Sequence, residues 1–395
     1  MKKLKIFISH HPSNLLLYRN MSYMAKRLDK DTKAVLFKIN HVYYKDFDLG
    51  PYLKHFDEIL EFDFITYSKN IISSWYKIFK FLSRFRKAMK SFENSFDEID
   101  LFLDNSAWLP LNIILYNLSR FKKVKNINRF SYIEPEDAET KVSRMKTFLC
   151  SLYSLPFNCY KVKVITSTKG TFSNFVYSEN PIGRIIKIAN PKGEFLKKIS
   201  SNKEEYFLPY PIFSKNIRLR KKAKKDMVVV FGLGDIFSCY PEYMSEQKVF
   251  LEKMEKFFKA LEKRYKRYKL YYKPHPQDER GVFIAGIDIK KYRLFDNSAS
   301  AQYLIDKYSD RIKAVYTFLS TSAVFSSFYS IPSYTFYRYI YNSDGVKRFD
   351  NMYDHENIKS DFLFHIFSIE EIGKIDNLKS ANNFDLKIYQ KILNV

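Results

Sequence analysis

The chain has 395 residues, which is enough for two or three domains. Its hydrophobic content of 46% excludes a mainly disordered chain, and its 10 glycines exclude collagen-like and low-complexity classes. Lys and Arg outnumber Asp and Glu by 67 to 43, a net charge of +24. That excess favours an anionic partner: nucleic acid, a membrane surface, or a phosphate-bearing or acidic-sugar substrate.

Targeting and redox signals are weak along the sequence. No apolar run approaches the roughly 18 residues that a membrane-spanning helix needs. The apolar stretch Ile6–Ile8 is too short for the core of a signal peptide. The three cysteines, Cys150, Cys159 and Cys239, have no metal-binding spacing and cannot form a disulfide framework. We therefore expect a reduced, cytoplasmic protein.

The first half of the chain alternates between strand and helix patterns. The predicted strands are Leu4–Ser9, Ala34–Ile39, Glu58–Phe62, Ile99–Leu103 and Asn126–Ile133. The predicted helices are Leu15–Leu28, Ile71–Met89 and Leu109–Phe121. This rhythm predicts a parallel sheet covered by helices.

The pattern breaks at 191–226, where prolines and the basic run Arg218–Lys225 indicate a linker. It then restarts. The predicted strands of the second half are Met227–Phe231, Lys269–Tyr272, Tyr292–Phe295, Ala314–Leu319 and Ser333–Tyr337, and the predicted helices are Glu246–Tyr265, Ala299–Tyr308 and Ser322–Tyr329. The sequence thus predicts an α/β protein with two Rossmann-like lobes, 1–190 and 227–395, that face a central cleft. Ligands of such folds bind beyond the carboxyl ends of the strands.

The most specific pattern is Tyr271–Pro276, which places His275 between two prolines at the end of a strand. Pro274 and Pro276 fix φ and remove two backbone donors, so the turn is stiff. His275 could donate to a phosphate or to a developing negative charge, and Lys273 could add a permanent charge. The alternative is a rigid loop that carries a surface histidine.

Two further turns follow strands of the same predicted sheet. Ser320, Thr321 and Ser322 stand at the start of a helix, where free N–H groups and hydroxyls could bind an anion, or where they could be an ordinary helix cap. Gly232 and Gly234 follow the first strand of the second half. In a chain so poor in glycine they indicate close approach of the backbone to a ligand, and a simple turn is the competing interpretation.

Carboxylates mark two other places. Glu134, Glu136 and Asp137 follow the fifth strand and could supply a general base, or could belong to the N-terminus of a helix that starts near Ala138. Asp46-Phe-Asp48 matches a metal-binding D-x-D pattern, but such short matches arise often by chance. No other spacing resembles a zinc or calcium site.

The predicted helix Ile71–Met89 combines an apolar stripe with several Lys and Arg residues. It is either a domain helix with its apolar face in the core or an interfacial helix that rests on anionic lipid. The basic run Arg218–Lys225 could serve the same surface or be a solvated linker.

These motifs, in this order, resemble bacterial sialyltransferases and polysialyltransferases of the two-lobed GT-B class. Those families have an acidic motif in the first lobe, then a His-Pro motif and a later Ser/Thr pair in the second. Here Glu134-Pro-Glu136, His275-Pro276 and Ser320-Thr-Ser322 follow that order. The acidic motif departs from the family pattern of two adjacent carboxylates and a glycine, which leaves the base open between Glu134, Glu136 and, less favoured, Asp137.

The resemblance implies inverting transfer of sialic acid or a related nonulosonic acid from a CMP-activated donor to a glycan of lipopolysaccharide or capsule, without a metal or other cofactor. It implies an acceptor-side lobe over 1–190 and a nucleotide-sugar lobe over 227–395, with the last helices packed back on the first lobe. The implied catalytic residues are Glu134, Glu136 and His275. The implied donor-binding residues are Gly232, Gly234, Lys273, Pro276, Ser320, Thr321 and Ser322.

Other functions compete with this one. A His-Pro motif followed by a Ser-rich turn also resembles Kdo transferases and transferases that use CDP-glycerol. The charge of +24 raises the different possibility of a nucleic-acid-binding protein. Against it, the charge is scattered and no recognised nucleic-acid motif occurs, so we expect no nucleic-acid partner. We expect instead peripheral attachment to the anionic inner face of the cytoplasmic membrane.

Overall fold

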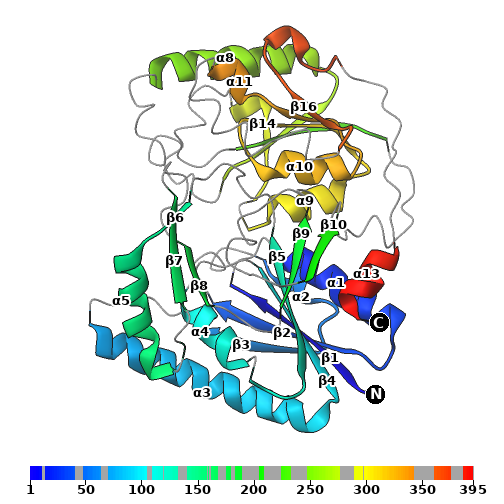
Figure 1. The fold of residues 1–395 in the computed structure, drawn as a ribbon. Coiled ribbons are helices and arrows are strands. Elements are labelled where there is room, and N and C mark those ends of the chain that lie inside the picture. The colour runs from blue at the N-terminus through cyan, green and yellow to red at the C-terminus, as the bar shows by residue number, and fades with distance from the viewer. Residues whose placement is uncertain are drawn as a thin grey trace. The chain divides into compact units, whose positions relative to one another are not determined.

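The structure is a computed structural model of the chain. It describes residues 1–10, 14–40, 48–63, 70–104, 109–118, 120–131, 140–157, 159, 162–167, 175–178, 183–188, 204–208, 224–232, 247–275, 289–296, 298–341, 360–374 and 386–394. The chain divides into two compact units, each built around its own parallel sheet (Figure 1). Unit 1 comprises 1–45, 49–211 and 385–395, and unit 2 comprises 46–48 and 212–384.

The main sheet of unit 1 is entirely parallel and has the strand order β3-β2-β1-β4-β5-β9-β10. Its strands are β1 (Lys3–Ser9), β2 (Lys33–Asn40), β3 (Glu58–Asp63), β4 (Glu98–Asp104), β5 (Val124–Ser131), β9 (Arg184–Ile188) and β10 (Glu204–Leu208). The order reverses between β1 and β4, as in a doubly wound Rossmann sheet.

The helices of unit 1 are α1 (Leu15–Leu28), α2 (Gly50–Leu53), α3 (Ile71–Ser95), α4 (Leu109–Leu118), α5 (Arg144–Ser154), η3 (Leu155–Phe157) and α13 (Leu386–Leu393). A small antiparallel sheet contains β6 (Thr140–Val142), β7 (Val162–Ser167) and β8 (Phe175–Ser178). The predicted helix start near Ala138 lies outside the described residues; the described chain continues with β6 from Thr140, and α5 begins at Arg144. Ser143 caps α5 by accepting from the backbone N–H of Lys146.

Unit 2 has the sheet order β13-β12-β11-β14-β15-β16, again entirely parallel. Its strands are β11 (Met227–Phe231), β12 (Lys269–Lys273), β13 (Arg293–Leu294), β14 (Ile312–Thr317), β15 (Ser333–Thr335) and β16 (Leu363–His365). Its helices are α8 (Gln247–Arg264), η5 (Ile289–Lys291), α9 (Ala301–Tyr308), α10 (Thr321–Phe328), α11 (Tyr337–Ile340) and η8 (Ile369–Glu371). In chain order its strands read 3-2-1-4-5-6, the doubly wound Rossmann order, so the predicted α/β class with two Rossmann-like lobes is confirmed.

The predicted linker at 191–226 needs correction. β10 lies within it and pairs in parallel with β9, so this segment contributes a strand to the first sheet. The end of the chain, 385–395, groups with unit 1, as expected from the prediction that the last helices pack back on the first lobe. There, Lys3 donates to the backbone carbonyl of Asn394 over 2.9 Å.

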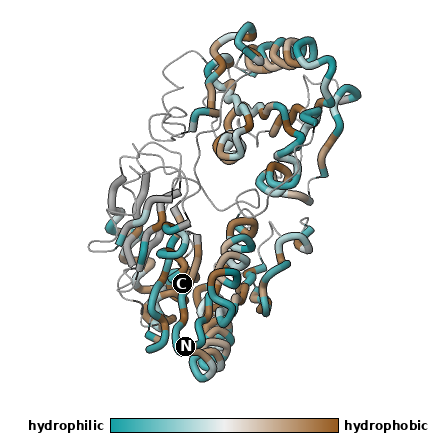
Figure 2. The backbone as a smooth tube through the Cα atoms, turned by 90° about the vertical axis from the view of Figure 1, so that its right-hand side faces the viewer, coloured by the Kyte–Doolittle hydropathy of each residue, from teal (hydrophilic) through white to brown (hydrophobic). Residues whose placement is uncertain are grey.

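Periodicity explains how the helices pack. Side chains on one face of α3, among them Ile78, Leu82, Phe85 and Met89, are buried in the core of unit 1 beneath the sheet. The helices alternate between hydrophobic and hydrophilic stretches along the chain (Figure 2), as amphipathic helices on a sheet do. Most of the predicted stripe of α3 thus lies in the core. None of the described helices is both long and apolar enough to span a bilayer.

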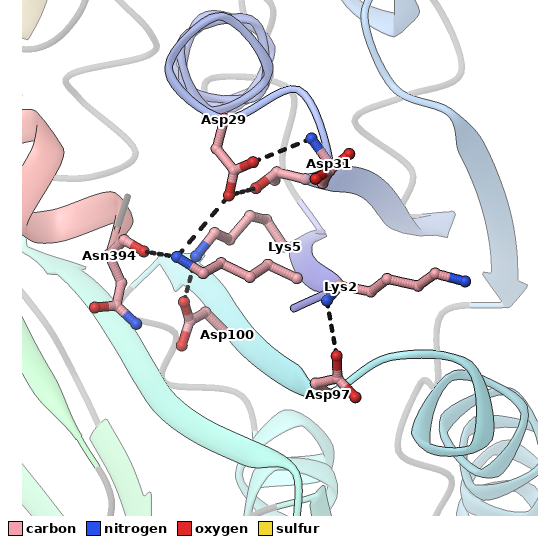
Figure 3. Close-up of polar contacts among 9 residues, drawn as sticks. Lys2, Lys5, Asp29, Asp31, Asp97, Asp100 and Asn394 are labelled. Atoms are coloured by element: carbon pink, nitrogen blue, oxygen red, sulfur yellow. Dashed lines mark hydrogen bonds and ion pairs between the residues drawn. The ribbon is translucent and has the colours of Figure 1, made fainter.

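A buried ion pair joins β1 to β4 (Figure 3). Nζ of Lys5 lies 2.5 Å from Oδ2 of Asp100, and both side chains are at most 2% exposed. Nδ2 of Asn126, on β5, donates to Oδ1 of Asp100 over 2.7 Å. The two buried charges therefore compensate each other, and the side chains that hold them come from three neighbouring strands. Buried charges need such partners.

Candidate functional site

The carboxyl ends of the strands of unit 2 are aligned in register. Phe231, the last residue of β11, pairs with Lys273 on one side and with Thr317 on the other. Thr317 in turn pairs with Thr335, and Thr335 pairs with His365. Five strand ends therefore form one row, and the turns that follow β12, β11 and β14 leave the same edge of the sheet.

Two of the predicted turns are in direct contact. The backbone N–H of Gly232 donates to the carbonyl oxygen of Lys273 over 2.8 Å. A Cβ at Gly232 would lie 2.6 Å from Oη of Tyr272 and 3.1 Å from the backbone N of His275. The glycine was predicted to permit close approach of a ligand, but the close approach observed here is that of the His275 turn itself.

Lys273 is a buried cation at this edge. It is 3% exposed, and its Nζ donates to the carbonyl oxygen of Pro274 over 2.9 Å. Burial lowers the pKa of Lys273 to about 8, and the carboxylate of Asp296 offsets part of that effect. Below that pH the side chain carries its positive charge next to the turn.

His275 is half-buried at the end of the same turn. Burial and then the positive charge of Lys273 lower the pKa of His275 to about 4. The imidazole is therefore neutral near neutral pH. A neutral imidazole still offers one N–H donor, so His275 can donate a hydrogen bond to an oxyanion without carrying a charge.

The third predicted turn forms the start of α10. Ser320 is the N-cap, and its Oγ accepts from the backbone N–H of Ser322 over 3.2 Å. Its hydroxyl also lies 3.0 Å from Oγ of Ser322. Ser320 thus acts as the ordinary cap that the sequence offered as the alternative, and Thr321 is the first helical residue. The helix N-terminus also carries the partial positive charge that favours anions.

The order β12-β11-β14 brings Gly232, Lys273, His275 and the Ser320–Ser322 turn to one edge, at the point where the strand order reverses. This is where open α/β sheets bind their ligands. The prediction that these turns follow strands of one sheet is confirmed. Gly234, Pro276, Glu134, Glu136 and Asp137 lie outside the described residues.

Residues that the sequence analysis did not single out also lie at this edge. Asp296 follows β13 and accepts from the backbone N–H of Ser298 over 2.8 Å, a bond that, with the charge of Lys273, lowers the pKa of Asp296. His365 ends β16, and its Nδ1 lies 2.6 Å from Oγ1 of Thr335. The apolar run Phe362–Ile366 around this histidine was the signal that could have indicated β16.

Asp46 and Asp48 form the one weak metal-binding pattern in the sequence, at which we predicted no metal site. Asp46 lies outside the described residues, and among those described no three His, Cys, Asp or Glu side chains form a group that could hold a metal ion.

Comparison with known protein families and with curated protein sequences gives no match. The fold is similar to several solved structures. One is the GT-B domain of a sialyltransferase from Photobacterium damselae, at 12% identity and a TM-score of 0.45, covering 92% of this chain and 99% of that one. Another is a Medicago truncatula protein in complex with UDP-glucose, at 11% identity and 0.46, covering 100% and 93%.

A third is UDP-N-acetylglucosamine 2-epimerase from Rickettsia bellii, at 12% identity and a TM-score of 0.43, covering 85% of this chain and 79% of that one. These identities and scores are too low for the resemblances to carry an argument about activity. The two Rossmann-type strand orders described above establish the fold class without them.

Proposed function

We propose that this protein is an inverting glycosyltransferase that moves sialic acid or a related nonulosonic acid from a CMP-activated donor to a cell-surface glycan. The observation that carries the proposal is the convergence of three turns at the β12-β11-β14 edge. Together they offer a buried lysine ammonium, a neutral histidine and a helix N-terminus, which are groups suited to a single nucleotide phosphate.

In the proposed reaction, an acceptor hydroxyl oxygen forms a bond to the anomeric carbon while the bond from that carbon to the phosphate oxygen breaks. CMP leaves with the electron pair of that bond. The proton of the acceptor hydroxyl passes to a carboxylate, for which we propose Glu134 first and Glu136 second. A general base of this kind contributes about 10²–10⁴-fold.

The second unit then stabilises the leaving group. His275 donates to the phosphate oxygen that gains charge, Lys273 supplies positive charge, and the Ser320–Ser322 turn supplies the N-terminal N–H groups of α10. Preorganised donors of this type act like an oxyanion hole. We propose that these groups perform the role of a divalent metal, so that turnover needs none.

A panel of nucleotides tests the donor class. Thermal shifts are measured with CMP, CDP-glycerol, UDP and single-stranded oligonucleotides, and each measurement is repeated with the Lys273→Met variant. Selective stabilisation by CMP that is reduced in Lys273→Met is the expected result. A larger shift with CDP-glycerol would assign the protein to glycerophosphate transfer instead. Stabilisation by single-stranded oligonucleotides alone would replace the enzyme proposal with nucleic-acid binding.

A further inference from the structure

The outward face of α3 carries apolar side chains that the core does not use. While Ile78, Leu82, Phe85 and Met89 are buried, Ile72, Tyr76 and Phe79 are 62–70% exposed. These three positions recur at intervals of four and three residues, so they form a second apolar face on the same helix. This face is confined to the N-terminal half of α3, because farther along the exposed positions are polar or basic, among them Ser83, Arg84, Arg86, Lys87 and Lys90.

A second helix adds to this face. α5 exposes side chains at the same helical spacing, with exposed fractions of 41–72%: Met145, Phe148, Leu149 and Leu152. The two helices are in contact, since the indole N–H of Trp75 donates to the carbonyl oxygen of Tyr153 over 3.0 Å. Figure 1 shows α5 beside the N-terminal part of α3.

Both helices are fixed in unit 1. Trp75, Cys150 and Tyr153 pack against its hydrophobic core. We call the exposed apolar residues of these two neighbouring helices the α3–α5 surface: Ile72, Tyr76, Phe79, Met145, Phe148, Leu149 and Leu152. Exposed apolar side chains that gather on a folded protein are typical of interaction sites.

Nearly all the charged side chains of the two helices are basic. α3 carries six Lys and Arg residues and a single acidic residue, Glu93, in its last turn. α5 carries Arg144 and Lys146 and no acidic residue. Lys77 and Lys80 are exposed on α3 next to the apolar side chains. Two copies of this surface would repel each other, whereas an anionic surface would attract it.

We infer that the α3–α5 surface docks on an anionic lipid bilayer. Aromatic and aliphatic side chains enter the boundary between headgroups and acyl chains, and Lys77, Lys80, Arg144 and Lys146 contact the headgroups. This is the pattern of an interfacial amphipathic element, with exposed apolar residues flanked by basic ones. The inference concerns unit 1 alone and does not depend on the proposed donor or reaction.

The fluorescence of Trp75 can report docking of the α3–α5 surface on a bilayer. The chain has two tryptophans, so Trp108→Phe leaves Trp75, at the contact between α3 and α5, as the single reporter. The full chain is mixed with vesicles of phosphatidylcholine and phosphatidylglycerol, with or without bromine on the acyl chains. Docking predicts quenching of Trp75 by the brominated lipid and sedimentation with the vesicles. Salt weakens the sedimentation, and pure phosphatidylcholine vesicles bind less protein.

Paired variants locate the surface. Phe79→Ser/Phe148→Ser should weaken vesicle partitioning about tenfold or more, since each side chain loses its insertion into the apolar region. Lys77→Gln/Lys80→Gln should weaken it about fivefold for each charge. The matched controls lie in unit 2, where Val249 and Leu294 are 52% and 53% exposed. Val249→Ser/Leu294→Ser and Lys256→Gln/Lys263→Gln should leave partitioning unchanged.

Three outcomes would overturn the inference. The first is that the protein does not sediment with anionic vesicles. The second is that the α3–α5 variants and the unit 2 controls lose partitioning equally. The third is that Phe79→Ser/Phe148→Ser converts an oligomer to a monomer in analytical ultracentrifugation while vesicle binding is unaffected, which would assign the surface to a second copy of the chain.

Discussion

The backbone N–H of Gly232 donates to the carbonyl oxygen of Lys273 over 2.8 Å, which joins the turn after β11 to the turn after β12. The contact explains why a glycine is needed at this position. A side chain would collide with Oη of the buried Tyr272 and with the backbone of the His275 turn. Position 232 is therefore packed directly against the turn that carries Lys273 and His275.

Gly232→Ala should lower the free energy of unfolding by about 1–3 kcal/mol, because the added methyl group overpacks a filled site. Urea denaturation measures the change. Tyr272→Phe removes the atom 2.6 Å from the new Cβ, so the double variant should recover part of the loss. If Gly232→Ala is as stable as the wild type, the close packing of the two turns is wrong.

Replacements of Ser320 separate its cap from the proposed anion site. Ser320→Ala should cost about 0.5–2 kcal/mol of stability, because the bond to the N–H of Ser322 is lost. Ser320→Asp keeps a capping oxygen and should be nearly as stable as the wild type. It places a negative charge at the proposed phosphate site, so calorimetry should show weaker CMP binding in Ser320→Asp than in Ser320→Ala. The reverse order would mean that α10 does not contact the phosphate.

The charge of Lys273 predicts a pH dependence. Because the pKa of Lys273 is about 8, the ammonium loses its charge as the pH rises through that value. CMP affinity should fall over the same range, in which the phosphate keeps its full charge, and the fall should be absent in Lys273→Met. Calorimetric titrations on both sides of pH 8 measure it. A decline that persists in the variant would belong to another group.

As the pH rises, the titration of Lys273 should change the stability of the fold in the direction opposite to its effect on CMP affinity. The unfolded chain holds the Lys273 proton up to a pKa of about 10.4, so between about 8 and that value the unfolded state binds more protons than the folded one. The free energy of unfolding of the wild type should therefore rise with pH through this window relative to Lys273→Met.

For the buried pair of Lys5 and Asp100, we predict a double-mutant cycle in which the effects of the two single variants are not additive. Lys5→Met or Asp100→Leu alone leaves one buried charge without its partner and should cost about 3–5 kcal/mol. The double variant should be much less destabilised, because two apolar side chains replace the whole pair. Chemical denaturation of the four proteins gives the coupling energy, and additive single effects would contradict the pairing in Figure 3.

Helices and strands with a clear hydrophobic pattern were predictable, because each pattern is contained in one short stretch of the sequence. Met227–Phe231 is five consecutive buried apolar residues, and the predicted range is the observed one. The predicted helix Leu15–Leu28 also matches α1, since its apolar spacing has the helical period. The alternation of these elements was sufficient to predict both Rossmann-type sheets.

Other elements depend on distant partners that one sequence does not reveal. β10 is Glu-Glu-Tyr-Phe-Leu between proline-containing segments, and its strand conformation follows from pairing with β9. β16 has three residues and forms the edge of its sheet by pairing with β15. The contact of Gly232 with the His275 turn and the exposed face of α3 likewise required the tertiary structure.

The central claim is that the edge formed by Gly232, Lys273, His275 and Ser320 acts on a CMP-activated sugar, and His275→Ala tests it most directly. The measurement is the rate of sugar transfer from CMP-sialic acid in the wild type and the variant, with circular dichroism as the control for folding. The half-buried His275 is a donor to the leaving phosphate in this account, so turnover should fall about 10²–10³-fold while the fold is retained. Near-wild-type transfer by a folded His275→Ala would contradict the account.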